Sequence, residues 1–424
     1  MSITIHPGQV GGTVPAPGSK SVTHRALLLT LLTRGGTIRN PLWSEDTLAT
    51  LGALKAFGLK AVATTEEAVI RGEPPHAGDI DAANSGTTLR LTTGLAATLP
   101  GTSRLTGDAS LSKRPMGPLV DALNQLGAEA TCHGEDGRPP ITVTGPAQGG
   151  TAKIRGDVSS QFISALLMAG PRCSDGVTVH LTSELTSRPY AELTIAMMRT
   201  AGFTVEELDE GWHVPAQRPP AVHLEVPGDY SACAFPLVAA AITGGKVTVT
   251  NLPEASGQGD EAILNILTTF GCKLTREDDA VTLHEAELTA AEIDLGDTPD
   301  LFPPLATLAA CTPGETRLHG APHLAHKESD RIQAMTEGLS ALGAKIQPTE
   351  DGAIIQGGSL SGGTVQHHHD HRIQMALAVA ALVADGPVTI QGPDDVHAVS
   401  YPAFLDHLTH LGIQVDRSDQ EAPA

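Results

Sequence analysis

Several cationic residues lie where apolar segments, predicted to be helices, begin. Lys20 and Arg25 lie in PGSKSVTHR, and Lys327 and Arg331 lie in HKESDR. A helix N-terminus offers free N–H groups and the positive end of the helix dipole, which together favour a bound anion. Further members of this set are Arg90, Lys113, Arg114, His371 and Arg372. Any one of them could be a solvated surface charge, but unpaired cations beside buried helices are costly. The set therefore predicts a site for carboxylate or phosphate groups.

Polar and acidic residues lie at other predicted helix starts. Ser159, Ser160 and Gln161 stand together in VSSQF, where they either cap the following helix or bind a phosphate or hydroxyl groups. Asp300 and Glu328 are likewise either helix caps or acid–base groups. Among cations, a carboxylate would be ionised and could accept a proton from a hydroxyl group. These residues therefore predict acid–base chemistry beside the anion site.

Composition argues against several other classes of protein. The 424-residue chain has 27 basic and 48 acidic residues and a net charge of −21, which disfavours binding to nucleic acid and anionic membranes. It lacks GxxxxGK[ST] and a GxGxxG after a strand, so nucleotide binding is not favoured. Its five cysteines are scattered singly and no signal peptide or transmembrane segment is predicted, so we expect a cytoplasmic protein.

A run of histidines, HHHDH (367–371), raises the question of a metal site. Adjacent histidines in a strand point to opposite faces, so they cannot all bind one ion. Partner ligands at zinc-site spacing are missing elsewhere in the sequence. We therefore predict that the run lies on an edge or loop, and we expect no metal.

A repeat of about 70 residues runs through the chain. Six apolar segments, each preceded by small polar residues, are predicted to be buried helices. Six amphipathic helices follow the same period, and each ends in a glycine, which supplies the left-handed turn that stops a helix. The apolar segments begin at Ser19, Asn84, Ser159, Asp229, Asp300 and Asp370, and the glycines are Gly58, Gly127, Gly202, Gly271, Gly343 and Gly412. Two markers with one period predict six copies of a unit containing both helices and strands.

Six units divide naturally into two lobes of three. Stretches rich in Pro and Gly, at 15–20 and 218–231, are places where few contacts would cross. A strand is expected at 2–10, and nothing after Gly412 completes the sixth unit. We therefore predict one lobe at 14–226 and a second made of 1–13 plus 227–424, completed by the N-terminal strand.

The motifs PGSKSVTHR, NSGTTLR, KRPMGPLVDAL, VSSQF, SRPY, KESDR and DHR resemble those of the EPSP synthase family, in order and spacing, over essentially the whole chain. The resemblance implies an α/β fold of the inside-out barrel type, with two similar lobes of three βαβαββ repeats around buried helices and an active site in the interlobe cleft. It implies transfer of the enolpyruvyl group of phosphoenolpyruvate to the 5-hydroxyl of shikimate 3-phosphate, with release of phosphate, in aromatic amino acid biosynthesis. The reaction would pass through a tetrahedral intermediate without a cofactor, and we expect a monomer.

The resemblance also assigns roles to residues. Lys20, Asp300 and Glu328 would be catalytic, although it does not say which handles each proton. The set for shikimate 3-phosphate is Lys20, Ser21, Arg25, Ser159, Ser160, Gln161, Ser187, Asp300, Lys327 and His323, with Tyr190 nearby. The set for phosphoenolpyruvate is Lys20, Asn84, Gly86, Arg114, Gln161, Arg331 and Arg372, with Arg90 in support.

Two positions depart from the family pattern. Val399 stands where many members have a lysine that touches phosphoenolpyruvate, and His323 stands where many have an asparagine that binds shikimate 3-phosphate. A lost charged hydrogen bond is worth about 1.5–3 kcal/mol, so the first change would weaken binding without abolishing activity.

Two other functions remain open. The related transferase that acts on UDP-N-acetylglucosamine has the same fold and donor, but it usually carries a cysteine or aspartate in a loop that here reads GDASLSKRPMG. A non-catalytic repeat protein would bind the anions without turnover, and the acid–base candidates argue against it. An assay with both acceptors separates the three functions.

Overall fold

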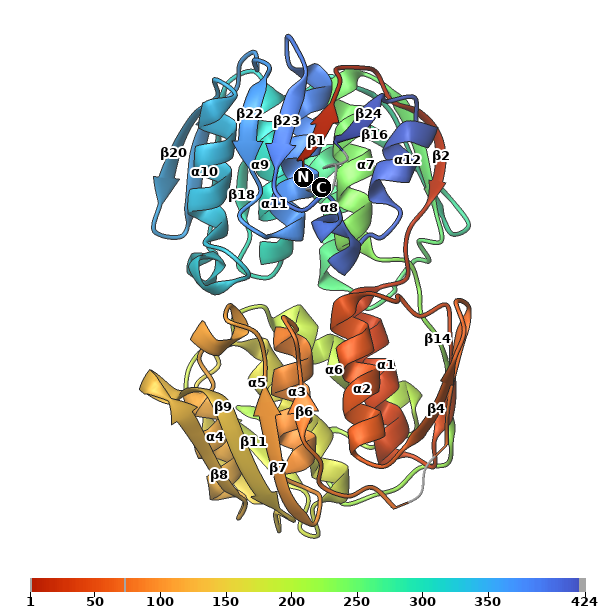
Figure 1. The fold of residues 1–424 in the computed structure, drawn as a ribbon, viewed down its shortest axis with the longest axis vertical. Helices are drawn as coiled ribbons and strands as arrows, with labels where there is room; N and C mark the ends of the chain where they lie inside the picture. The colour runs from red at the N-terminus through yellow and green to blue at the C-terminus, as the bar shows by residue number, and fades with distance from the viewer. Residues whose placement is uncertain (1, 72–73, 419–424) are drawn as a thin grey trace, which may run out of the picture. The chain divides into compact units, whose positions relative to one another are not determined.

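The computed structural model describes residues 2–71 and 74–418, and the chain divides into two compact units (Figure 1). Unit 1 comprises Met1–Pro17 and Pro227–Ala424, and unit 2 comprises Gly18–Val226. Each unit has its own apolar core. The two units are therefore described separately.

Three four-stranded sheets surround the core of unit 2. Their strands are β3 (Gly36–Arg39), β4 (Lys60–Ala63), β5 (Glu67–Arg71), β6 (Ile80–Asp81), β7 (Gly101–Thr106), β8 (Glu129–Gly134), β9 (Arg138–Gly145), β10 (Gly150–Ile154), β11 (Val177–Leu181), β12 (Glu206–Leu208), β13 (Gly211–Val214) and β14 (Val222–Glu225). The strand orders are β14-β3-β5-β4, β6-β7-β9-β8 and β10-β11-β13-β12. In each sheet the first two strands of the order pair in parallel, and the other neighbouring strands pair antiparallel.

Unit 1 repeats this pattern three times. Its strands are β1 (Ser2–Ile5), β2 (Gly11–Pro15), β15 (Lys246–Thr250), β16 (Cys272–Glu277), β17 (Ala280–Ala286), β18 (Glu292–Asp294), β19 (Glu315–His319), β20 (Lys345–Thr349), β21 (Gly352–Gln356), β22 (Gly363–Gln366), β23 (Val388–Gln391) and β24 (Val415–Ser418). The orders are β2-β15-β17-β16, β18-β19-β21-β20 and β22-β23-β1-β24. The N-terminal β1 lies between β23 and β24 and is antiparallel to both, so it supplies the third strand of the last sheet.

Two series of helices connect the strands. The apolar series is α1 (Lys20–Leu32), α3 (Gly86–Ala96), α5 (Ser160–Ala169), α7 (Tyr230–Thr243), α9 (Phe302–Cys311) and α11 (His371–Ala380). The amphipathic series is α2 (Glu45–Ala56), α4 (Gly117–Gln125), α6 (Arg188–Thr200), α8 (Ile263–Thr269), α10 (Arg331–Ala341) and α12 (Phe404–His410). The apolar helices are buried almost throughout: α3 packs on α1 and α5 in unit 2, and α7, α9 and α11 pack together in unit 1 (Figure 1). None of the described helices combines the length and apolar character that crossing a bilayer requires.

The predicted helix-stop glycines all adopt left-handed backbone conformations. Their φ angles are 90° at Gly58, 89° at Gly127, 88° at Gly202, 89° at Gly271, 87° at Gly343 and 101° at Gly412. L-residues with a Cβ pay a steric cost there. Together with the element order and the six sheets, these glycines confirm the six-fold repeat predicted from the sequence and the βαβαββ order implied by the family resemblance.

Gly343→Ala and Gly271→Ala form a matched pair that tests these turns. An added Cβ at Gly343 would lie 3.7 Å from Ser361 Oγ, whereas at Gly271 it would clash with the backbone oxygen of Glu287. We expect Gly343→Ala to lower the free energy of unfolding by about 1 kcal/mol through left-handed strain alone. Gly271→Ala should cost about 1–3 kcal/mol more, because the backbone must move. Urea unfolding measures both, and equal losses would contradict this explanation.

Candidate active site

Lys20 is held at the start of α1 by a carboxylate from α2. Its ammonium lies 3.1 Å from Asp46 Oδ2, and the two side chains are only 14% and 8% exposed. A mostly buried ion pair restricts where the ammonium can lie. Sequence analysis singled out Lys20 but missed Asp46.

Arg25 lies one turn further along α1 and is fully buried. Its Nε donates to Thr194 Oγ1 at 2.7 Å, and its Nη atoms donate to the carbonyl oxygens of Ser21 (2.9 Å) and Tyr190 (3.0 Å). Burial lowers the pKa of Arg25 to about 10, so the side chain stays cationic at neutral pH. The bonds to α6 show that Arg25 joins two helices as well as supplying charge.

The start of α3 brings two guanidinium groups to one glycine. Arg114 Nη2 donates to Asn84 Oδ1 at 3.5 Å. A Cβ on Gly86 would lie 2.8 Å from Arg114 Nη1 and 3.2 Å from Arg90 Nη1. Only a glycine therefore lets both cations approach the first turn of this helix without displacement. The structure thus brings together three residues predicted for phosphoenolpyruvate.

Gln161 links the starts of α5 and α3. Its Oε1 accepts from Arg90 Nη1 at 2.7 Å, and its Nε2 donates to Thr87 Oγ1 at 3.0 Å. The guanidinium of Arg90 also lies 5.6 Å from the centre of the Phe162 ring. Arg90 is therefore held from two sides, and the carboxamide of Gln161 is fixed in orientation.

The predicted phosphate-binding serines lie at helix starts in the same unit. Ser159 caps α5, its Oγ accepting from the backbone N–H of Gln161 at 3.3 Å, and Ser160 is the first residue of that helix. Ser187 precedes α6 with φ 53° and ψ 41°, a left-handed conformation that is uncommon for residues other than glycine. Such strain is often found at functional sites. Ser21 is the second residue of α1.

In unit 1, three cations surround the carboxylate of Asp300. Oδ1 lies 2.8 Å from Arg331 Nη1 and 3.4 Å from Lys327 Nζ, and Oδ2 lies 3.1 Å from Arg372 Nη2. The carboxylate is 20% exposed, so a ligand can reach it. The structure thus brings together four residues that sequence analysis predicted separately.

Arg331 is the most buried member of this group, at 1% exposure. Besides Asp300 it contacts Glu328 Oε2 at 2.8 Å and Asp370 Oδ2 at 2.9 Å. The three carboxylates raise the pKa of Arg331 well above its usual range, against the effect of burial. Asp370, fully buried, also caps α11 by accepting from the backbone N–H of Arg372 at 2.9 Å. Sequence analysis missed Asp370 because an aspartate before a helix reads as an ordinary cap.

Arg372 connects this group to α7. Its Nη2 donates to Ser231 Oγ at 2.9 Å, and Ser231 Oγ donates to Asp229 Oδ1 at 2.7 Å. Asp229 in turn caps α7. The starts of α7, α11 and the turn before α9 are therefore joined by one chain of polar contacts.

The two positions that depart from the family pattern differ in character. His323 lies in the 3₁₀ turn Pro322–His326. Burial, and next the charge of Lys327, lower its pKa to about 4, so it is neutral at pH 7. Val399 ends the 3₁₀ turn Val396–Val399 and supplies no cation.

The histidine run lies in a turn after β22. His368 Nε2 is 3.2 Å from Glu337 Oε2, and Asp370 is occupied by Arg331. Among the described residues, no group of three or more His, Cys, Asp or Glu side chains could hold a metal ion.

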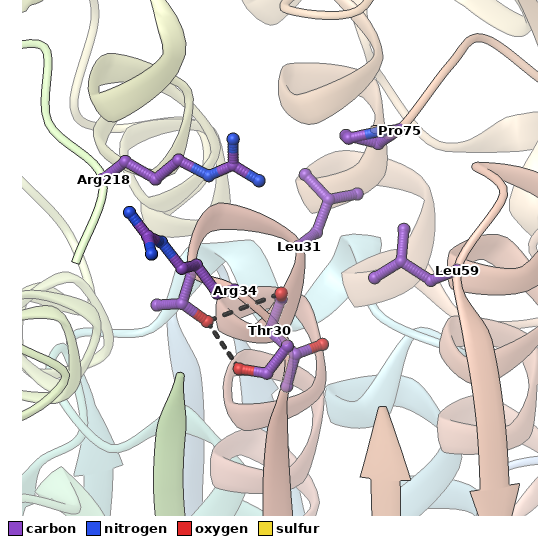
Figure 2. A pocket seen from close by; sticks show the side chains of 8 residues that line it. Thr30, Leu31, Arg34, Leu59, Pro75 and Arg218 are labelled. Atoms are coloured by element: carbon purple, nitrogen blue, oxygen red, sulfur yellow. Dashed lines mark hydrogen bonds between the residues drawn. The ribbon is translucent and has the colours of Figure 1, made fainter. Parts of the chain in front are cut away.

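A separate pocket of about 280 Å³ lies at the opposite end of α1 from Lys20. Figure 2 shows Arg34 and Arg218 on one side and Leu31, Leu59 and Pro75 on the other. None of the predicted site residues lines it. The pocket is therefore not part of the candidate site.

Arg331→Ala should destabilise the protein strongly, because it leaves the buried Asp370 without its cation. We expect a loss of about 3–5 kcal/mol in the free energy of unfolding. Arg417→Ala is the control, since Arg417 pairs with Asp406 at a similar distance of 3.1 Å but with side chains 50% and 78% exposed. Its loss should stay below about 1 kcal/mol. Comparable losses in denaturant unfolding would show that the buried network contributes little.

The chain is similar to known proteins along nearly its whole length. The model of the family EPSP synthase (3-phosphoshikimate 1-carboxyvinyltransferase) matches residues 5–408. The 3-phosphoshikimate 1-carboxyvinyltransferase of Methanocorpusculum labreanum is 46% identical over 97% of this chain and 99% of its own length, and that of Natronomonas pharaonis is 42% identical over 98% and 99%. The solved structure of EPSP synthase from Acinetobacter baumannii superposes with a TM-score of 0.83 at 32% identity, over 98% of this chain and 100% of that one. The chain belongs to the EPSP synthase family.

Proposed function

We propose that the chain transfers the enolpyruvyl group of phosphoenolpyruvate to the 5-hydroxyl of shikimate 3-phosphate through the helix-start residues of its two units. The family is that of the 3-phosphoshikimate 1-carboxyvinyltransferases, transferases of aromatic amino acid biosynthesis, and this chain is such an enzyme. The observation that carries the residue assignment is Asp300, a carboxylate with three cationic groups within 3.4 Å. This arrangement places a candidate base next to cations that could bind an anionic substrate.

The residues of unit 2 suit recognition of anions. We assign Asn84, Gly86 and Arg114 to phosphoenolpyruvate, since the glycine leaves room beside two guanidinium groups. Ser21, Arg25, Ser159, Ser160 and Ser187 are assigned to shikimate 3-phosphate. Gln161 and Lys20 would contact both substrates.

The residues of unit 1 suit proton transfer coupled to anion binding. Arg331 and Arg372 are paired with Asp300 in the structure. Anionic groups of phosphoenolpyruvate would compete for these guanidinium groups and weaken their hold on Asp300. Asp300 would then be the stronger base for the proton of the 5-hydroxyl. Substrate binding and activation of the base would thereby be linked.

The chemistry is an addition followed by an elimination. Protonation of the methylene carbon of phosphoenolpyruvate makes the adjacent carbon electrophilic, and the 5-hydroxyl oxygen attacks it. Loss of a methyl proton from the tetrahedral intermediate then restores the double bond and expels phosphate. Lys20, Glu328 and Asp300 are the groups that we propose for the proton transfers. A monomeric state and a cytoplasmic location stay predictions.

Asp300→Asn tests the role of the base, because it keeps the shape and removes the charge. We expect kcat for phosphate release, with both substrates present, to fall about 10²–10⁴-fold. Lys20→Met should lower kcat/KM for both substrates. Lys55→Met, which changes an exposed lysine in the last turn of α2, is the control and should leave turnover within about twofold of the unmodified protein.

Near-normal turnover of Asp300→Asn would contradict its assignment. Replacing shikimate 3-phosphate by UDP-N-acetylglucosamine in the same assay tests the rival acceptor. Substrate binding without phosphate release by the unmodified protein would favour a non-catalytic anion-binding protein instead.

His323→Asn tests the depressed pKa of this histidine. Its pKa is about 4 in the folded protein and near 6.5 in an unfolded chain. Unfolding therefore takes up a proton between these values, so stability falls as the pH drops through this window. Between pH 7 and pH 5 the unmodified protein should lose about 2 kcal/mol more than His323→Asn. Urea unfolding at both pH values measures this, and parallel losses would show that His323 titrates normally.

A further inference from the structure

We infer that a buried line of hydrogen bonds through His24, Thr50 and Thr88 positions the start of α3, where phosphoenolpyruvate is proposed to bind. Thr88 is the central positioning residue of this line. His24 Nδ1 lies 2.7 Å from Thr50 Oγ1, and Thr50 Oγ1 lies 2.7 Å from Thr88 Oγ1. The three residues come from α1, α2 and α3, and each is fully buried. The inference rests on the proposed assignment of Asn84 and Gly86.

Thr88 connects this line to the cap of α3 and to the backbone of Asp46 in α2. Its Oγ1 lies 2.8 Å from Ser85 Oγ, and Ser85 caps α3 between Asn84 and Gly86. The same hydroxyl lies 3.1 Å from the backbone oxygen of Asp46, the residue whose carboxylate holds Lys20. One hydroxyl therefore contacts both the cap of α3 and the residue that pairs with Lys20.

His24 is suited to anchor the line as a neutral group. Burial and the charges of Lys20 and Arg25 lower its pKa well below 6.5. A neutral ring next to two cations costs less than a third buried charge would. Its Nδ1 then donates a hydrogen bond to Thr50 Oγ1 in one tautomer and accepts one from it in the other.

This line fixes the three helices relative to one another, because hydrogen bonds tolerate little change in distance. Both threonines are fully buried beside the apolar core, so no water can replace a hydrogen bond that the line loses. The helices α1, α2 and α3 can therefore slide past one another only by breaking these bonds. Asn84 and Gly86 move with α3, so their position depends on Thr88.

Thr88→Val tests the inference against Thr93→Val, a matched change in the same helix. Thr93 is also fully buried, but its hydroxyl donates only to the carbonyl oxygen of Leu89, at 2.6 Å in its own helix. We expect Thr88→Val to raise KM for phosphoenolpyruvate about five- to twentyfold, with kcat and KM for shikimate 3-phosphate within about threefold. Thr93→Val should change none of these by more than about twofold, and Thr88→Ser, which keeps the hydroxyl, should restore KM.

Thr50→Val breaks the same hydrogen bond from the other side, and it replaces Thr88→Val if that variant does not fold. The double variant should raise KM little more than one change alone, because both changes remove the same Thr50–Thr88 hydrogen bond. Equal effects on the two substrates, equal effects of Thr88→Val and Thr93→Val, or fully multiplicative effects in the double variant would each overturn the inference. Turnover by the unmodified protein tests the proposed function itself, so the two failures are distinguishable.

Discussion

The guanidinium of Arg331 is buried against Asp300, Glu328 and Asp370, and the chemistry assigned to unit 1 depends on this contact. A buried arginine without carboxylates would be costly, and so would the buried carboxylate of Asp370 without its arginine. The network therefore holds the carboxylate that we propose as the proton acceptor and three cations within one cluster, at the starts of α10 and α11. Under that proposal an incoming anion would share the cations of Asp300, so substrate binding and base strength would be linked.

The repeat explains how such clusters can form in a chain with a net charge of −21. In four of the six repeats, the apolar helix follows the first strand of its sheet and leads to a second, parallel strand. In the repeats of α1 and α7, the strand before the helix lies in another sheet, and β14 and β2 respectively supply the first strand beside β3 and β15. All six sheets therefore contain the same parallel pair, and the start of an apolar helix recurs three times within each unit. The free N–H groups and dipoles of these starts add to the charges of Lys20 and Arg114 in unit 2 and of Lys327 and Arg372 in unit 1. Folding thus gathers cations at the helix starts without a basic composition.

The sequence predicted the architecture well because the repeat carries two independent signals. Helix-stop glycines such as Gly271 are needed for a backbone conformation, and buried helices need continuous apolar runs, so both leave marks in a single sequence. The sequence predicted the cationic residues of the site better than the carboxylates that pair with them. Asp46 and Asp370 look like ordinary residues of helix starts, and only the fold shows which lysine or arginine each one reaches. Likewise, the spacing of Arg25 shows a charge near a helix start but not its bonds to α6.

The internal partners of the cations also limit how strongly an anion can bind. A phosphate that reaches Arg372 gains a charged hydrogen bond but displaces part of the contact with Asp300, so its net gain is smaller than that of one such bond in isolation. The paired cations of unit 1 are better suited to changing the state of Asp300 than to tight binding.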